Sequence, residues 1–83
     1  MASWQVKLRT FPSSSFEDFC RVWRKHGGGK DDAVIARSLR ALRAGSGEPP
    51  VIAEYGEKET AERVIEEVEN LAGDAELIEV PDP

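Results

Sequence analysis

The chain has 83 residues, which is the length of one small domain. Its contents of 40% hydrophobic and 33% charged residues are typical of a folded domain with a charged surface. No apolar run approaches the roughly 18 residues of a membrane span, and the first residues lack a signal peptide's apolar stretch. The single cysteine excludes an internal disulfide. We therefore expect one domain over residues 1–83 and a cytoplasmic location.

The net charge of −5 is distributed unevenly along the chain. Residues 1–45 carry nine Lys and Arg against four Asp and Glu, whereas residues 46–83 carry two against twelve. This division predicts one basic and one acidic surface. The alternative is that the two halves attract each other within the fold.

The first third of the chain predicts a strand and then a helix. Residues alternate between apolar and polar from Trp4 to Phe11, which indicates a half-buried strand that ends at Pro12. The serines at 13–15 are candidates for the N-cap of the helix that follows. The apolar stripe of that helix has helical spacing and consists of Phe16, Phe19, Cys20 and Trp23.

A second helix is predicted after the glycines at 27–29. Asp31 or Asp32 would cap its first turn, and Gly45 suits the left-handed position after its last turn. Its apolar stripe consists of Ile35, Leu39 and Leu42, with Val34 beside it. The arginines at 37, 40 and 43 have a spacing that places them on another face. A second strand is predicted over 51–55.

The third helix has the clearest pattern in the sequence. Thr60 is its candidate N-cap, Gly73 its candidate C-terminal glycine, and the last strand follows over 75–80. The acidic residues Glu62, Glu66, Glu67 and Glu69 lie off the apolar stripe. That stripe consists of Ala61, Val64, Ile65, Val68, Leu71 and Ala72.

The predicted element order is β-α-α-β-α-β, which indicates an α+β fold. We expect a two-layer sandwich in which three helices cover one face of a three-stranded sheet. A strand over 33–39 would instead give a ferredoxin-like β-α-β-β-α-β order. The helical spacing and the arginines of that segment argue against this alternative.

The motifs of common catalytic sites are incomplete in this sequence. The segment 27–30 reads Gly-Gly-Gly-Lys, but Arg24 and Asp31 occupy positions where a phosphate loop needs Gly and Ser or Thr. Cys20 lies on an apolar stripe, where we expect a buried thiol, and His26 lies on another face. We therefore predict no enzyme, no cofactor and no metal site, while a small enzyme that uses Cys20 remains the third hypothesis.

The arginines of the first two helices are the candidate binding site for an anionic partner. We expect an acidic protein surface rather than a nucleic acid, because the total charge is negative and the aromatic residues belong to apolar stripes. A merely solvated face is the alternative interpretation. The residues are Arg37, Arg40 and Arg43, together with Arg21 and Arg24.

The segment from Tyr55 to Ala72 resembles the third-helix region of the ClpS adaptors. In that family an aromatic residue after a strand is followed by an Ala-Glu pair and by apolar positions that end in Leu-Ala. The positions in step here are Ala61, Glu62, Ile65, Val68, Leu71 and Ala72. The order of elements over residues 4–80 is also similar to the C-terminal domain of ribosomal protein L7/L12.

The resemblance implies a protein-binding adaptor or regulator. The acidic residue with which the family docks on a Clp-type unfoldase matches Glu59, although its basic partner position holds Val64. The Asn-Asp pair of the N-degron pocket is absent, because the first strand continues into Arg-Thr-Phe-Pro-Ser at 9–13. The second hypothesis is a structural or assembly component, acting as a homo-oligomer or as a ribosome-associated factor.

Overall fold

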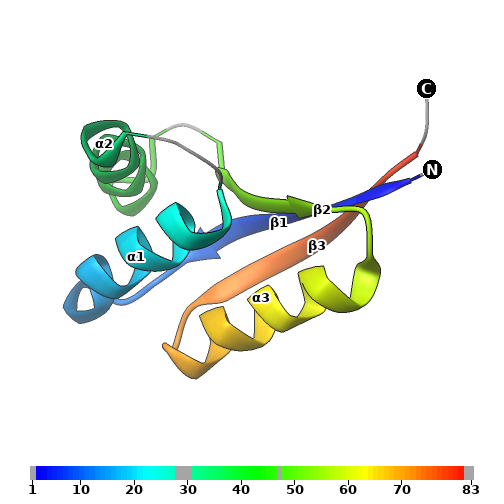
Figure 1. The fold of residues 1–83 in the computed structure, drawn as a ribbon. Helices are drawn as coiled ribbons and strands as arrows, with labels where there is room; N and C mark the ends of the chain where they lie inside the picture. Colours follow the sequence, from blue (N-terminus) through cyan, green and yellow to red (C-terminus); the bar gives the residue numbers. More distant parts are fainter. Residues whose placement is uncertain (1, 28–30, 47, 82–83) are drawn as a thin grey trace.

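The predicted α+β fold is confirmed. A computed structural model describes residues 2–27, 31–46 and 48–81, and it has the expected order of elements (Figure 1). The strands are β1 (Ser3–Thr10), β2 (Val51–Tyr55) and β3 (Asp74–Val80). The helices are η1 (Ser13–Ser15), a single 3-10 turn, followed by α1 (Phe16–His26), α2 (Asp32–Arg43) and α3 (Lys58–Asn70).

The strands form one antiparallel sheet in the order β2-β1-β3, so β1 is central. Val6 at its middle lies opposite Ala53 on one side and Leu77 on the other. The register with β2 shifts just after Val6, because Ile52 is an extra residue on β2. That residue is fully buried, so the bulge turns an additional side chain into the core.

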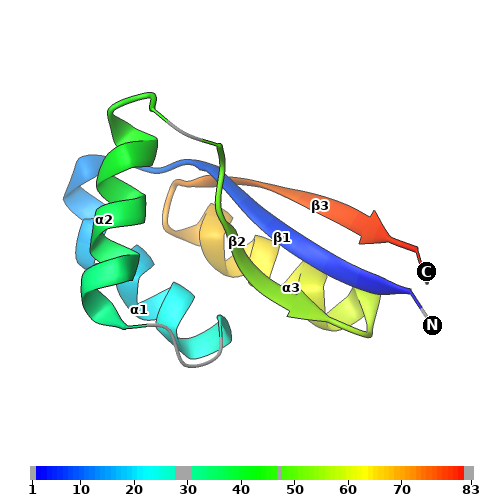
Figure 2. The same cartoon turned by 90° about the horizontal axis from the view of Figure 1, so that it is seen from above.

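The helices α1 and α3 pack against one face of the sheet, as Figure 1 shows. The third helix, α2, packs mainly against α1 and also reaches β1 (Figure 2). Val6 and Leu8 are fully buried on the covered face, as the alternation of the first strand predicts. The remaining core consists of Phe11, Phe19, Val22, Trp23, Ile35, Leu39, Ile52, Ala53, Ala61, Val64 and Val68.

Two predictions for α2 are confirmed. Its N-cap is Asp31, whose carboxylate accepts a hydrogen bond of 3.2 Å from the Ala33 amide. Gly45 has a φ of +76°, the left-handed conformation that favours glycine after a helix. Because α2 is continuous from Asp32 to Arg43, the alternative strand over 33–39 is wrong.

The other predicted caps are wrong in whole or in part. Ser15 is the N-cap of α1, one of the predicted positions, but its side chain makes no capping hydrogen bond, and the three serines form η1. The N-cap of α3 is Glu57 rather than Thr60, so Thr60 lies inside the helix. At the other end, Ala72 takes the positive φ of 64° that was expected at Gly73. The predicted stop at 27–29 is observed only at Gly27, since residues 28–30 lie outside the described residues.

Gly73 is required by close packing instead. A Cβ atom at this position would lie 2.5 Å from the Phe19 ring and 3.0 Å from a methyl carbon of Val68. Both neighbours belong to the buried core, so neither has free space into which it could move.

None of the helices in the described parts of the chain is long and apolar enough to cross a membrane.

We predict that Gly73→Ala lowers the free energy of unfolding by about 1–3 kcal/mol, because the new methyl overpacks the core. Gly56→Ala is the matched control, since a Cβ there meets nothing within 4 Å. It should change stability by less than about 0.5 kcal/mol. Urea denaturation of both variants tests the packing, and equal effects would contradict it.

Candidate functional site

The predicted basic residues gather on the paired helices α1 and α2. Arg24 on α1 lies 3.2 Å from Asp32 at the start of α2, and Arg40 near the end of α2 lies over the ring of Phe16 at the start of α1. The two helices therefore run antiparallel side by side. All five predicted arginines are exposed. We call Arg21, Arg24, Arg37, Arg40 and Arg43 the basic lobe.

Two arginines of the basic lobe also hold the fold together. The guanidinium of Arg43 donates a hydrogen bond of 2.8 Å to the Phe11 carbonyl. It also lies 5.6 Å from the centre of the Phe11 ring. Arg40 lies 5.7 Å from the ring centre of Phe16. The Arg43 contacts attach α2 to the connection between β1 and α1, and the Arg40 contact attaches it to the first residue of α1, so both side chains are positioned by the fold.

The other three arginines differ in their neighbours. Arg21 lies 3.6 Å from Asp18, and Arg24 is paired with Asp32, so part of the basic charge is offset locally. Arg37 forms no ion pair or side-chain hydrogen bond within the described parts of the chain. Its charge is therefore the most available to a partner.

We predict that Arg43→Ala lowers the free energy of unfolding by about 1 kcal/mol, because it removes a charged hydrogen bond and an aromatic contact. Arg37→Ala should change it by less than about 0.5 kcal/mol. Thermal and urea denaturation of both variants measure the difference. A loss of stability in Arg37→Ala equal to that in Arg43→Ala would contradict these assignments.

The resemblance-based site residue Glu59 lies apart from the basic lobe, in the first turn of α3. Its side chain is 80% exposed and lies 3.4 Å from Arg63 on the next turn. Exposed pairs of this spacing contribute little to stability, so Glu59 remains free to exchange partners. The structure does not bring Glu59 together with the predicted arginines.

The acidic half of the sequence forms a groove between α3 and β3. The groove has a volume of about 580 Å³, and three glutamates of α3 stand beside an apolar floor. Its lining consists of Glu62, Ile65, Glu66, Glu69, Ala75 and Leu77. We call this feature the acidic groove. The sequence pattern placed its glutamates off the apolar stripe of the third helix but did not predict the groove or its floor.

The two halves of the chain meet electrostatically at one point. Among the ion pairs of the described residues, those that join the two halves both end on Glu67. Lys25 approaches it at 3.3 Å and His26 at 2.9 Å. The arginines of α1 and α2 and the glutamates that line the acidic groove form no ion pair with each other in the described parts of the chain, which supports the prediction of two oppositely charged surfaces.

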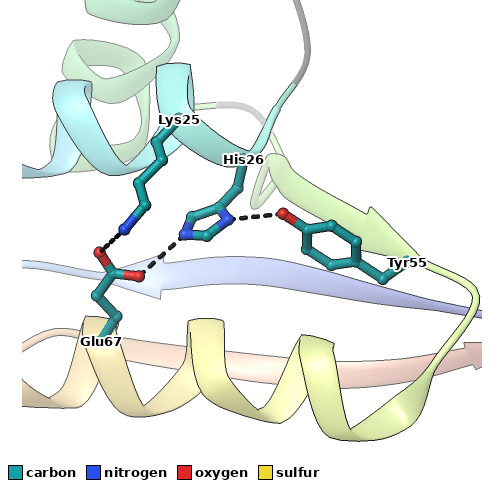
Figure 3. A network of polar contacts seen from close by, with 4 residues as sticks. All are labelled: Lys25, His26, Tyr55 and Glu67. Carbon is teal, nitrogen blue, oxygen red and sulfur yellow. Dashed lines mark hydrogen bonds and ion pairs between the residues drawn. The ribbon is translucent and has the colours of Figure 1, made fainter.

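His26 is the centre of a polar network that the sequence reasoning missed (Figure 3). Its Nδ1 lies 2.7 Å from the Tyr55 hydroxyl and its Nε2 lies 2.9 Å from the Glu67 carboxylate. The network joins α1, β2 and α3, and the His26 side chain is only 14% exposed. The partners are separated from His26 by 29 and 41 residues, so no local pattern could have revealed them.

The tautomer of His26 that carries its proton on Nε2 can make both of these hydrogen bonds. Its Nε2–H donates to Glu67, and its Nδ1 accepts from the Tyr55 hydroxyl. Hydrogen bonds from His26, and then from Lys25, lower the pKa of Glu67, against the opposing effect of burial. A hydroxyl, an imidazole and a carboxylate in this order can relay a proton. Their placement on three elements also makes them a clamp for the fold.

The predicted thiol site is not assembled. Cys20 is half-buried rather than fully buried, and burial, then the nearby Asp32, raises the pKa of its thiol. Both nitrogens of His26 are occupied by Tyr55 and Glu67, so His26 is not paired with Cys20. A raised pKa disfavours the thiolate, which is the nucleophilic form.

Within the described parts of the chain, no three His, Cys, Asp or Glu side chains are grouped so that they could hold a metal ion.

Comparison of the chain with protein-family models, with curated proteins and with solved structures finds no match. The resemblance to ClpS therefore stays a prediction that rests on the third-helix segment and on the order of elements.

We predict that Glu67→Gln lowers the free energy of unfolding at pH 7 by about 0.5–1 kcal/mol, a modest value because the carboxylate is 35% exposed. The pKa of Glu67 is lowered by folding, so its contribution is complete above its ordinary value of 4.5. It is lost as the pH falls through the lower, folded-state pKa. The difference from the unchanged protein should therefore vanish in strong acid.

Urea denaturation across a pH series measures this difference. Glu66→Gln is the matched control, because its exposed side chain has no ion-pair partner within the described residues. That variant should follow the unchanged protein at every pH. A Glu67→Gln difference that persists at low pH would mean that the side chain stabilises the fold by packing rather than by charge.

Proposed function

We propose that this protein is a small cytoplasmic protein-binding module, an adaptor or regulator that contacts an acidic protein surface through the basic lobe. The observation that carries the proposal is the display of five exposed arginines on two helices packed side by side. Contacts with Phe11 and Phe16 hold two of these arginines in place. A positioned arginine loses less side-chain freedom on binding than a freely moving one.

Such a lobe favours fast, salt-dependent association. Exposed charges act collectively by steering an oppositely charged partner toward them, and dissolved salt screens this attraction. Arg37 is the strongest candidate for the central contact, since no described acidic group offsets it. Asp18 and Asp32 beside Arg21 and Arg24 limit the net positive charge, which favours a protein partner over a nucleic acid.

The ClpS-like version of the proposal assigns one partner class. A Clp-type unfoldase would then contact Glu59, whose side chain is 80% exposed at the start of α3. This contact surface is acidic and separate from the basic lobe. The two versions therefore make opposite demands on the charge of the partner, which allows one experiment to distinguish them.

The alternative is an assembly component that associates with itself through the uncovered sheet face or an edge. The uncovered face carries the polar residues Ser3, Gln5 and Glu54, with Ser3 hydrogen-bonded to Glu54 at 2.7 Å. The register of β3 also places Ile78 and Val80 on this face, opposite Gln5 and Ser3. In the described parts of the chain, the one large hydrophobic residue that is strongly exposed is Val34, on α2. A face that mixes polar side chains with two half-buried apolar residues supports weak, exchanging contacts better than a permanent homo-oligomer.

We predict that replacing Arg37 and Arg40 by alanine reduces capture of the partner at least severalfold, because it removes exposed charge from the centre of the basic lobe. The measurement is an affinity pull-down from the native cell's lysate at low and high salt, read by mass spectrometry. The genuine partner should be enriched with the unchanged protein and released by salt.

Two further variants complete the experiment. Arg63→Ala removes one exposed positive charge outside the basic lobe and should leave capture unchanged. Glu59→Ala tests the ClpS-like version, and selective loss of a Clp-type unfoldase in that variant would support it. If the double arginine variant keeps every partner, the basic-lobe proposal is wrong, and a protein that captures only itself would favour the assembly alternative.

A further inference from the structure

The acidic groove lies beside a free strand edge. Among the strands of the described residues, the order β2-β1-β3 leaves β3 paired on one side only, so half of its backbone N–H and C=O groups point away from the sheet. Such an edge can hydrogen-bond an additional strand from another chain. β3 is seven residues long, enough to pair with a short extended peptide.

The register of β3 shows which of its side chains border the groove. Leu77 lies opposite Val6 and Ala75 lies opposite Leu8, and directly opposed residues of an antiparallel pair share one face. Val6 and Leu8 are fully buried against the helices, so Leu77 and Ala75 face the helix layer too. Both are only half-buried, because the layer is incomplete at this edge.

A fourth strand added at the β3 edge would cover the half-buried side chains that the helices leave open. It would lie about 4.8 Å from β3, and every second side chain would point toward the helix layer. There it would cover the floor of the groove, which Ile65 of α3 forms together with Ala75 and Leu77. The groove therefore offers backbone pairing and an apolar contact to the same occupant.

The charges around the groove specify the occupant further. Glu62, Glu66 and Glu69 recur at the spacing of one helix stripe, and none has an ion-pair partner in the described parts of the chain. Glu79 adds an exposed carboxylate on the groove side of β3, whereas Glu76 lies on the uncovered face opposite Lys7. A basic strand would offset this repulsion, whereas an acidic one would increase it.

The same charges argue against a second copy of this chain as the occupant. Pairing of two β3 edges would bring two identical sets of carboxylates together, and like charges on neighbouring strands are destabilising. The basic lobe of a second copy is helical, so it has no free strand edge to offer.

We propose that the acidic groove binds a basic, extended peptide segment of a partner protein, which adds to β3 as a fourth strand. This site is separate from the basic lobe and does not depend on it. With both surfaces in use, one molecule of this protein bridges an acidic and a basic partner, which is the geometry that an adaptor needs.

The test uses the isotope-labelled full chain and a synthetic peptide of about seven residues. Every second position carries valine or lysine in turn, so that both kinds of side chain face the groove, and the positions between them carry threonine. Titration should shift the amide resonances of β3 and of residues 62–69, and should slow hydrogen exchange of the β3 amides. The same peptide with an N-methyl group on every backbone nitrogen keeps its side chains but has no N–H donor on either edge, so it cannot pair. It should bind about tenfold more weakly or worse.

Charge variants provide the second measurement. Glu62→Lys combined with Glu66→Lys should weaken binding about tenfold, whereas Glu48→Lys changes an exposed charge outside the groove and should have little effect. If the double variant does not fold, the N-methylated peptide still decides, because it is measured on the unchanged protein.

Four results would overturn the proposal. They are equal binding of the N-methylated peptide, equal binding of a peptide with glutamate in place of each lysine, resonance shifts that leave out β3 and residues 62–69, and no binding at millimolar peptide. Sedimentation that shows a dimer broken by the double variant would assign the groove to a second copy instead. None of these results bears on the basic lobe, so the two proposals fail independently.

Discussion

The central position of β1 is the constraint on which the rest of this domain depends. β1 pairs with both other strands, and its two buried residues, Val6 and Leu8, lie beneath the helix layer. Because the sheet has only three strands, both of its outer strands are edges. A small domain has little surface to bury, so it covers one face of the sheet and leaves the other face and the edges open. The surfaces available for binding are therefore those that the three helices do not cover.

The positive and the negative charges of the domain lie on different open surfaces. The arginines lie on the helix pair α1 and α2, where aromatic contacts hold two of them. The glutamates lie along α3 and β3, where an apolar floor is left at the sheet edge. Lys25, His26 and Glu67 are the point of contact between the two charge sets. The basic lobe and the acidic groove, the two surfaces that we propose as binding sites, therefore have opposite charge.

The His26 network explains how these surfaces keep their relative positions. His26 ends α1, Tyr55 ends β2 and Glu67 lies on α3, so a single imidazole connects one element of the basic lobe to the acidic helix. Partly buried charged hydrogen bonds are stronger than exposed ones, since water competes less for them. The close packing of Phe19 against Gly73 adds a second connection between α1 and the start of β3.

The sequence by itself determined the elements, their order and most of the core, because periods of two and 3.6 residues are local properties of a chain. The N-cap at Asp31 and the left-handed Gly45 were likewise predictable from a few neighbouring residues. Tertiary structure alone decided the His26 network, the floor of the acidic groove and the role of Gly73. Each of these depends on residues far apart in sequence that meet only when the helices pack on the sheet. The tertiary structure also decided which arginines stabilise the fold and which remain available to a partner. The sequence spacing places a side chain on a helix face but does not identify its neighbours.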